Sequence, residues 1–359
     1  MRNRTLTAAL LAAALLLAGC GGSGAGEGPE PGPPSGAERR AERRADGAEL
    51  LYRADGRHSA QNPAFAPDGR SVLLTEFSEG YNKGEAGLGV LPLDGSRTPR
   101  TVLADRDRAA VNLPGTSWNA AADAFAFATD RESGHDEVWL MKPGGAPERV
   151  TAHTDDSGYS EPSFSPDGEW IVFQQSWEPE HPAAEGGAAE GDEAERDSLW
   201  KVRRGGGPPV RLVDGRATGT DNRQPNWSPT GDRIVFQRRG AGRADWALWT
   251  VDADGGGLRM VTDAPGEHTD PSWSPDGRFL VFSSDLGGLP NAQVFVVPAD
   301  GGTPVRVTRA DAAYDGAPSW SPDGKWIAFE SARGGEAGPA ALWRIPAPTL
   351  RPPVAVSGR

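Results

Sequence analysis

The chain has 359 residues and a formal net charge of −13, so it repels phosphate backbones, and this charge excludes a general nucleic-acid binder. Its 48 glycines and 32 prolines exceed a fifth of the sequence, which favours many turns and excludes a fold of long helices. Its 12 tryptophans supply material for a large core and exclude a chain that is disordered throughout.

Residues 1–19 have the organisation of a bacterial export signal. Two arginines precede an apolar run, Leu6 to Leu17, which is too short to cross roughly 30 Å of hydrocarbon as a helix. The run ends in LAGC (17–20), which resembles the lipobox of bacterial lipoproteins. The resemblance implies cleavage before Cys20, a lipid on its thiol, and a place on the cell membrane or outer membrane facing the periplasm or exterior. An ordinary secretory signal with an incidental cysteine is the alternative.

Residues 20–47 are rich in glycine, proline, glutamate and arginine, with almost no large apolar side chain. Such a stretch cannot bury enough surface to offset its chain entropy. We therefore expect a flexible, lipid-anchored linker that holds a folded domain away from the membrane.

From residue 48 to residue 359 the sequence repeats. Each unit has an aromatic anchor, usually a Ser-Pro-Asp-Gly turn, and an apolar run, as in DPSWSPDGRFLVFSSD from Asp270. The anchors are spaced by 53, 46, 63, 46 and 47 residues, which is typical of four-stranded propeller blades. They are Phe65, Trp118, Phe164, Trp227, Trp273 and Trp320.

Each unit predicts four short strands. The anchor lies in the first strand and the apolar run forms the second. Because the second strand has consecutive apolar residues, both of its faces must be covered, which excludes a β-sandwich with one wet face. We therefore predict an all-β, six-bladed β-propeller with four antiparallel strands per blade. The third strands are centred on Val90, Trp139, Trp200, Trp249, Phe295 and Trp343, and the fourth lie at Val102, Val150, Leu212, Val261, Val307 and Val356.

Two details of the ring stay open. The strand that completes the last blade is either Glu49 to Arg53 or Pro353 to Ser357. An insertion at about residues 178–197 holds eight acidic residues and one arginine, and predicts a solvated, disordered hairpin extension. A docking or cation-binding loop is the alternative.

The repeat closely resembles the TolB-type propeller repeat over roughly residues 48–359. The shared pattern is P-x-W-S-P-D-G, then I-A-F-x-S, an L-W-x-V-like strand, D-G-G and R-x-V-T. The second unit departs from it, because NAAA (119–122) replaces the turn, and we expect a looser turn there. The resemblance implies participation in a periplasmic or cell-surface complex.

The aspartates of the turn motif recur once per blade, too far apart to share one ion, so we expect them to serve the turns. Better candidates for ligand or partner binding precede the first strand or lie at its start, where propeller loops surround one mouth of the central channel. Their residue types differ from blade to blade. They are His58, Asn62, Asn112, Tyr159, Glu161, Asp221, Arg223, His268, Asp270, Tyr314 and Asp315.

No Gly-x-Ser-x-Gly elbow, His-Glu-x-x-His helix, phosphate loop or dinucleotide fingerprint occurs in the sequence. We therefore predict a monomeric, non-enzymatic binding module for a protein, a peptide or a cell-envelope component, with no cofactor. One alternative is a metal-dependent lactonase or lyase, with calcium held by oxygens near the channel. Its ligands would come from His268, Asp270, Asp221, Glu161 and Asp315. The other is a glycan or small-molecule sensor with exposed aromatic side chains at the mouth.

Overall fold

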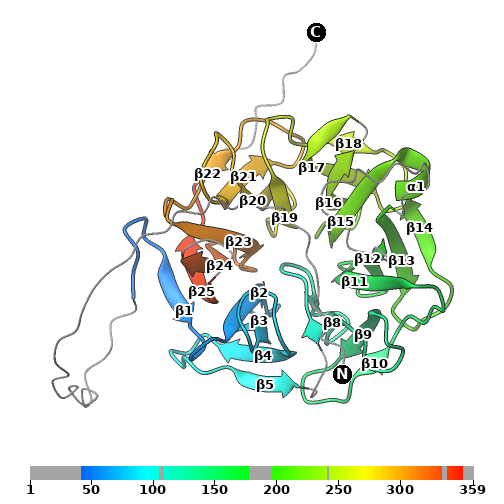
Figure 1. The fold of residues 1–359 in the computed structure, drawn as a ribbon, viewed down its shortest axis with the longest axis horizontal. Coiled ribbons are helices and arrows are strands. Elements are labelled where there is room, and N and C mark those ends of the chain that lie inside the picture. The colour runs from blue at the N-terminus through cyan, green and yellow to red at the C-terminus, as the bar shows by residue number, and fades with distance from the viewer. Residues whose placement is uncertain (1–41, 105–108, 178–195, 241, 334–337, 351–359) are drawn as a thin grey trace, which may run out of the picture.

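The computed structural model describes residues 42–104, 109–177, 196–240, 242–333 and 338–350. Six antiparallel sheets stand side by side around a ring, which Figure 1 shows from above. Five sheets have four strands, and in the other one the inner strand is split into two pieces. The predicted six-bladed β-propeller is confirmed. The predicted signal peptide, Cys20 and most of the linker lie outside the described residues.

In the first five blades the chain runs from the inner strand outward. The first blade consists of β2 (Ser59–Phe65), β3 (Ser71–Phe77), β4 (Ala86–Pro92) and β5 (Arg100–Leu103). The second consists of β6 (Ala110–Val111), β7 (Trp118–Asn119), β8 (Ala124–Thr129), β9 (Glu137–Met141) and β10 (Glu148–Arg149). The third consists of β11 (Ser157–Phe164), β12 (Trp170–Trp177), β13 (Ser198–Arg203) and β14 (Val210–Val213), followed by the short helix α1 (Gly215–Thr218).

The remaining blades repeat the same plan. The fourth consists of β15 (Thr220–Trp227), β16 (Arg233–Gly240), β17 (Arg243–Asp252) and β18 (Arg259–Met260). The fifth consists of β19 (His268–Trp273), β20 (Phe279–Ser284), β21 (Gln293–Pro298) and β22 (Val305–Arg306). The sixth has β23 (Ala313–Trp320), β24 (Trp326–Arg333) and β25 (Ala340–Pro346), and its outer strand is β1 (Glu49–Tyr52).

The ring is closed by its N-terminal strand. β1 pairs antiparallel with β25, with Leu50 opposite Trp343, and it lies on the outer side of the sixth blade in Figure 1. Of the two predicted closing segments, the structure therefore uses the first. The other segment, together with Val356, lies outside the described residues.

The predicted strand centres agree with the observed strands except at some outer edges. All six third-strand centres lie within β4, β9, β13, β17, β21 and β25. Val102 and Leu212 lie in β5 and β14, whereas Val150, Val261 and Val307 directly follow the two-residue strands β10, β18 and β22. Short outer strands leave little unpaired edge for another chain to extend.

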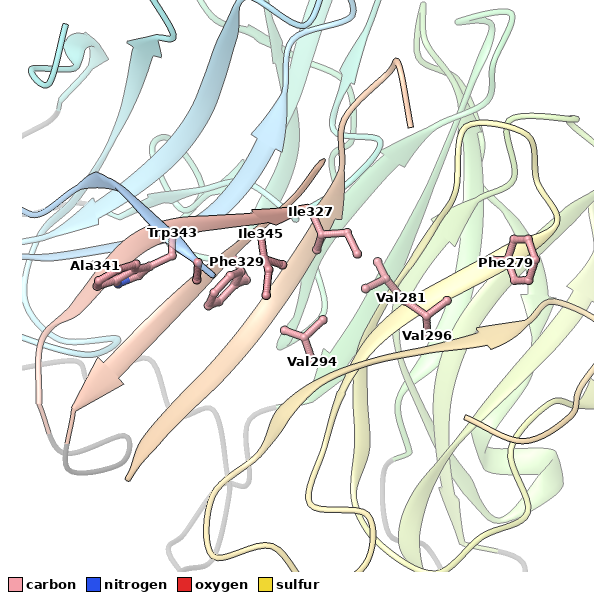
Figure 2. Packing of buried hydrophobic residues seen from close by; sticks show 10 residues of the cluster. Phe279, Val281, Val294, Val296, Ile327, Phe329, Ala341, Trp343 and Ile345 are labelled. Carbon is pink, nitrogen blue, oxygen red and sulfur yellow. The ribbon is translucent and has the colours of Figure 1, made fainter. Parts of the chain in front are cut away.

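Each sheet is packed on both faces, as the apolar runs predict. Ile327 and Phe329 of β24 face Val281 and Val296 of the fifth blade, and Figure 2 shows this layer. Ala328, which lies between them in sequence, belongs to the cluster shared with the first blade. Side chains alternate between the two faces of a strand, so consecutive apolar residues serve two interfaces. Truncation of the fully buried Phe329 to alanine should cost about 3–5 kcal/mol.

The recurrent aspartates lie in the turns between the first and second strands. Asp276 Oδ1 accepts the Ser274 hydroxyl at 2.7 Å and the Arg278 backbone N–H at 3.1 Å, and Gly277 has φ 69°. In the second blade, Asn119 Oδ1 accepts the Ala122 N–H at 2.8 Å, and Asp123 adopts φ 49°. A different sequence thus makes a turn of the same length.

Folded contacts begin ahead of residue 48, where the sequence predicted the end of the linker. Residues 42–47 fold back on β1, since the Arg44 N–H donates to Ala48 O at 2.8 Å and the Leu50 N–H to Glu42 O at 2.9 Å. The Arg44 side chain reaches the sixth blade. Composition alone could not reveal this, because the partner of Arg44 is distant in sequence.

Candidate functional site

The antiparallel pairings define two ends of the ring. We call the end where the chain enters the inner strands the mouth face, and the end with the Ser-Pro-Asp-Gly turns the turn face. Ser59 pairs with Phe77, so the loop of residues 53–58 and the loop of residues 78–85 both lie on the mouth face. The inner strands of the other blades begin at the same end of the ring. The candidate residues from the sequence therefore belong to one end of the molecule.

Three residues before each anchor the backbone turns left-handed. The φ angles are 54° at Asn62, 55° at Glu161, 53° at Gln224, 52° at Asp270 and 47° at Ala317. In the second blade, Gly115 takes this position with φ 93°. The strand register shifts at the five non-glycine positions, so each is a β-bulge in an inner strand. Left-handed backbone at non-glycine residues is strained, and it persists here because neighbouring blades hold it.

The bulges hold the blades together by a chain of hydrogen bonds. Glu161 Oε2 accepts the Gln224 backbone N–H at 2.9 Å, and Gln224 Oε1 accepts the Asp270 N–H at 2.8 Å. Gln224 Nε2 also donates to Asp270 Oδ1 at 2.6 Å, and the Ala317 N–H lies 3.5 Å from Asp270 Oδ2. The side chains of Glu161, Gln224 and Asp270 thus each receive a backbone N–H from the next blade.

Second strands add acceptors to the same chain of bonds. Gln174 and Gln237 accept the N–H groups of Gln224 and Asp270 at 3.1 and 3.2 Å. Glu330 Oε2 accepts the Asn62 N–H at 3.0 Å, which joins the sixth blade to the first. The polar groups around the channel therefore satisfy backbone donors that the bulges free from the sheets.

Burial raises the pKa of the acidic groups of this ring. It raises the pKa of Glu330 to about 7, against hydrogen bonds from Tyr81 and the Asn62 N–H. It also raises the pKa of Glu161 to about 7, against the positive charge of Arg223. The pKa of Asp270 is raised by burial as well. Burial therefore disfavours the charged forms of these three carboxyl groups.

One loop reaches over the mouth from the first blade. Tyr81 donates its hydroxyl to Glu330 Oε1 at 2.6 Å, and its ring meets Tyr314 edge-on at 5.8 Å. The adjacent Asn82 N–H donates to Gln61 Oε1 at 3.2 Å. The loop of residues 78–85 is thereby fixed to the first and sixth blades.

The second blade fills the channel further in. Asn226 of the fourth blade donates Nδ2–H to Pro114 O at 2.9 Å and accepts the Thr116 hydroxyl at 2.7 Å. A Cβ on Gly115 would lie 2.8 Å from Asn226 Oδ1 and 3.0 Å from Ser272 Cβ of the fifth blade. The second blade does not adjoin the fourth or fifth, so residues 114–116 must cross the channel. In Figure 1 a loop of the second blade can be followed into the middle of the ring.

Three sequence candidates lie within the structure of the blades. Asn112 is buried and exchanges hydrogen bonds with Thr75 at 2.9 and 3.2 Å. Tyr159 stacks on His153 with ring centroids 4.1 Å apart. His268 is fully buried between Ser284 Oγ at 2.8 Å and Ala264 O at 2.9 Å. These three side chains therefore contribute to packing and hydrogen bonding within the blades.

The other charged candidates form ion pairs. Asp221 pairs with Arg196 at 3.1 Å and Arg239 at 3.7 Å. Arg223 pairs with Asp197, which is buried, although the sequence placed Asp197 in the solvated insertion. Residues 178–195 of that insertion lie outside the described residues. His58 lies exposed, with Nδ1 3.0 Å from Glu76.

The sequence missed several residues of this site. Gln224 and Ala317 share the repeat position of Asn62, Glu161 and Asp270, so the alignment could have identified the complete set. Nothing in the repeat pattern indicated Tyr81 and Arg44, because they come from a loop and from the presumed linker. Glu330 lies within an otherwise apolar second strand, and the repeat pattern did not indicate a role for it.

The calcium alternative requires several ligand side chains in one cluster. In the part of the chain that the structure describes, no group of three or more His, Cys, Asp and Glu side chains is placed to hold a metal ion. His268, Asp221 and Asp315 each bind a different partner, away from Glu161 and Asp270. Over the same residues, no helix has the length and apolar character that a membrane crossing requires.

Comparison with known proteins agrees with the repeat geometry. Residues 215–338 match the family described as TolB beta propeller domain. Over these residues the repeats are similar to those of that family. A solved TolB from Acinetobacter baumannii superposes with a TM-score of 0.52 at 17% identity, over 81% of this chain and 63% of that one. An oligogalacturonate lyase from Vibrio parahaemolyticus superposes with a TM-score of 0.55 at 12% identity, over 86% and 96%. At these identities the likeness concerns the fold.

A curated relative is also similar to this chain. It is the uncharacterized protein Atu1656 of Agrobacterium fabrum, 26% identical over 206 residues, which are 55% of this chain. The chain spans 59% of the length of that relative and 63% of the Acinetobacter TolB. Both of these proteins have regions with no counterpart in the match.

Proposed function

We propose that this TolB-type propeller is a membrane-anchored, extracytoplasmic lipoprotein that acts as a non-enzymatic binding module. It binds a protein, a peptide or a cell-envelope component with its mouth face, as a monomer. The anchor is the lipid on Cys20, and residues 20–41 connect it to the first folded contacts.

The proposal depends on the hydrogen bonds that the polar groups of the channel make within the protein. Glu161, Gln224 and Asp270 receive backbone N–H groups of neighbouring blades, and residues 114–116 cross the channel beneath them. Groups committed to the scaffold are poorly suited to proton transfer or to leaving-group chemistry on a substrate. What this arrangement provides is a rigid rim of loops, and a preordered surface loses little entropy when it binds.

Site-specific photocrosslinking in intact cells tests the face. A benzophenone amino acid placed at Arg57 or Lys83 lies on exposed loops of the mouth face. Matched positions on the turn face are Arg278 and Lys325, whose side chains are 59% and 76% exposed. We expect discrete crosslinked products from the first pair and none from the second. Equal products from both pairs, or products only from the turn face, would refute the assignment of the binding face.

Membrane fractionation tests the anchor separately. We expect Cys20→Ser to release the protein from the membrane fraction, while the neighbouring Ser23→Ala leaves it bound. Retention of the Cys20→Ser protein in washed membranes would show that the lipid is not what holds it.

A further inference from the structure

The fourth blade contains a buried arginine that no carboxylate of the described residues neutralises. Arg238 is 8% exposed, and its Nη1 is buried without a hydrogen-bond partner. Its guanidinium lies over the Trp249 ring, 5.0 Å from the centroid. Burial lowers the pKa of Arg238, and no acidic group opposes that effect. Unpaired charge of this kind is costly inside a protein, so its presence requires an explanation.

The sixth blade contains a similar stacked arginine, Arg44, which has carboxylate partners. Arg44 lies over Phe329 and Trp343, at 5.4 and 5.6 Å from the ring centroids. Its Nη1 also approaches Ser331 Oγ at 3.3 Å. Burial alone would lower the pKa of Arg44, but the charge and hydrogen bonds of Asp315 and Asp46 outweigh it and raise the pKa.

Repeat alignment makes the two sites equivalent. Ser331 pairs with Asp315 in the sixth blade, and at the same register Arg238 pairs with Asn222 in the fourth. Trp343 and Trp249 both pair with the phenylalanine two residues before these positions. The fourth and sixth blades thus each hold a guanidinium over the third-strand tryptophan. The carboxylate of Asp315 has been replaced by the neutral amide of Asn222.

Asn222 does not compensate Arg238. Its Nδ2 donates to Asp197 O at 2.9 Å and Thr220 O at 3.1 Å, so the amide is turned to the backbone. The nearby carboxylate of Asp221 is taken by Arg196 and Arg239. Over the described residues, the fourth blade therefore keeps the cation and the aromatic platform but lacks the anion.

Position favours a ligand from solution. Arg238 lies two residues before the end of β16, and Gly240 at that end pairs with Thr220 at the mouth face. It shares a strand face with Phe236, which packs on Leu212 and Val213 of the third blade. The site therefore lies at the mouth-face end of the interface between the third and fourth blades. A guanidinium presents its N–H groups as a planar fork that fits a carboxylate.

We propose that Arg238 is the anchor of a carboxylate-binding site, in which a carboxylate from an external ligand takes the place that Asp315 has in the sixth blade. The site discriminates by charge and by the planar, two-oxygen geometry of the anion. It does not depend on the proposed function, because a carboxylate metabolite or an acidic peptide would satisfy it equally.

Thermal unfolding of the propeller in sodium acetate, against sodium chloride at equal ionic strength, tests the site. A ligand bound only to the folded state must raise the melting temperature, and millimolar affinity predicts a rise of about 2 °C at tens of millimolar acetate. We expect Arg238→Met to abolish the acetate-specific rise. The matched control is Arg239→Met, whose side chain is 37% exposed and already paired, and it should respond as the wild type does.

Two further measurements keep the test decisive. Arg238→Lys retains the charge without the planar fork, and should weaken the concentration dependence of the rise at least about fivefold. It serves in place of Arg238→Met if that variant does not fold. Inorganic phosphate is the comparison anion. No acetate effect in the wild type, a full effect in Arg238→Met or Arg238→Lys, or a response to phosphate alone would overturn the proposal.

Discussion

Arg44 and Asp315 form a two-pronged ion pair, at 2.8 and 2.7 Å, although 271 residues separate them in the sequence. Asp315 is fully buried, and Asp46 joins the same guanidinium at 2.8 Å. Asp46 also accepts the Arg309 backbone N–H at 3.0 Å, between the fifth and sixth blades. The first folded residues after the linker are thus fastened to the last blade of the ring, beside the strand that closes it.

Removal of Arg44 should therefore weaken the whole propeller. Arg44→Ala leaves Asp315 buried without its counter-ion, and we expect a loss of about 3–5 kcal/mol in the free energy of unfolding. Urea denaturation of the propeller from residue 42 onward measures this. Arg43→Ala is the control, because Arg43 pairs with Glu49 but is 68% exposed, and should cost less than about 1 kcal/mol. Equal losses for the two variants would contradict the role of the buried pair.

The buried carboxyl groups predict that stability falls as the pH rises through neutrality. Glu330 titrates near pH 4.5 in the unfolded chain, and burial raises its pKa to about 7 in the folded state. Between these values the folded state holds the proton that the unfolded state has released, so stability declines with rising pH. The loss from this one group approaches its full value above pH 7, on the order of 3 kcal/mol.

Glu330→Gln isolates that contribution. The amide oxygen keeps an acceptor for the Asn62 N–H and the amide NH2 can donate to the Tyr81 hydroxyl oxygen, but the group does not ionise. We expect its free energy of unfolding to exceed that of the wild type at pH 8 and to fall less between pH 5 and pH 8. Glu169→Gln removes a carboxylate that is 58% exposed and should follow the wild-type curve. Parallel curves for Glu330→Gln and the wild type would show that Glu330 is not the titrating group.

Local signals explain why the fold was predictable. The anchors, the Ser-Pro-Asp-Gly turns and the doubly apolar second strands each report contacts within one blade or with the next, and six copies reinforce the same interpretation. For the closing strand the sequence left two candidate segments, because both had the pattern of a fourth strand. Only the tertiary pairing with the sixth blade distinguishes them. Asp197 and Arg44 were misplaced for the opposite reason: both lie in polar stretches, and their burial depends on partners in other blades.

The sequence predicted where the mouth residues lie, but not their backbone conformation or their bonding partners. Asn62, Glu161 and Asp270 were identified as mouth residues, yet their left-handed backbone and their bonds to adjacent blades were not foreseen. A bulge depends on how blades meet, which a repeat pattern does not express. Tyr159 and His268 share the repeat position of Asp315, where each blade fills the same space with a different side chain. At this position the variation between blades therefore reflects packing.

The crossing of the channel predicts an unusual sensitivity at Gly115. Alanine there must adopt φ 93° and place its Cβ 2.8 Å from Asn226 Oδ1, where no real Cβ fits. Gly144 has φ 77° in a hairpin with nothing within 4 Å of the added Cβ. Both alanine variants incur the left-handed strain of about 1–2 kcal/mol, so the difference between them measures crowding. We expect Gly115→Ala to cost at least about 2 kcal/mol more by urea denaturation. Similar values would mean that residues 114–116 are not held in the channel.

Divalent ions provide the test that separates the binding module from the metal-dependent enzyme. Asp270 binds the Gln224 side chain at 2.6 Å, and Glu161 accepts the Gln224 N–H at 2.9 Å, so an ion would have to displace bonds that join the blades. Burial raises the pKa of Glu161 to about 7 and also raises the pKa of Asp270, and protonated carboxyls are poor ligands for hard cations. We expect millimolar calcium, manganese or zinc to leave the melting temperature within about 1 °C of a magnesium control at pH 6 and at pH 8. A rise of several degrees at pH 8 that Asp270→Asn abolishes would place a metal in the channel and restore the enzyme as the better hypothesis.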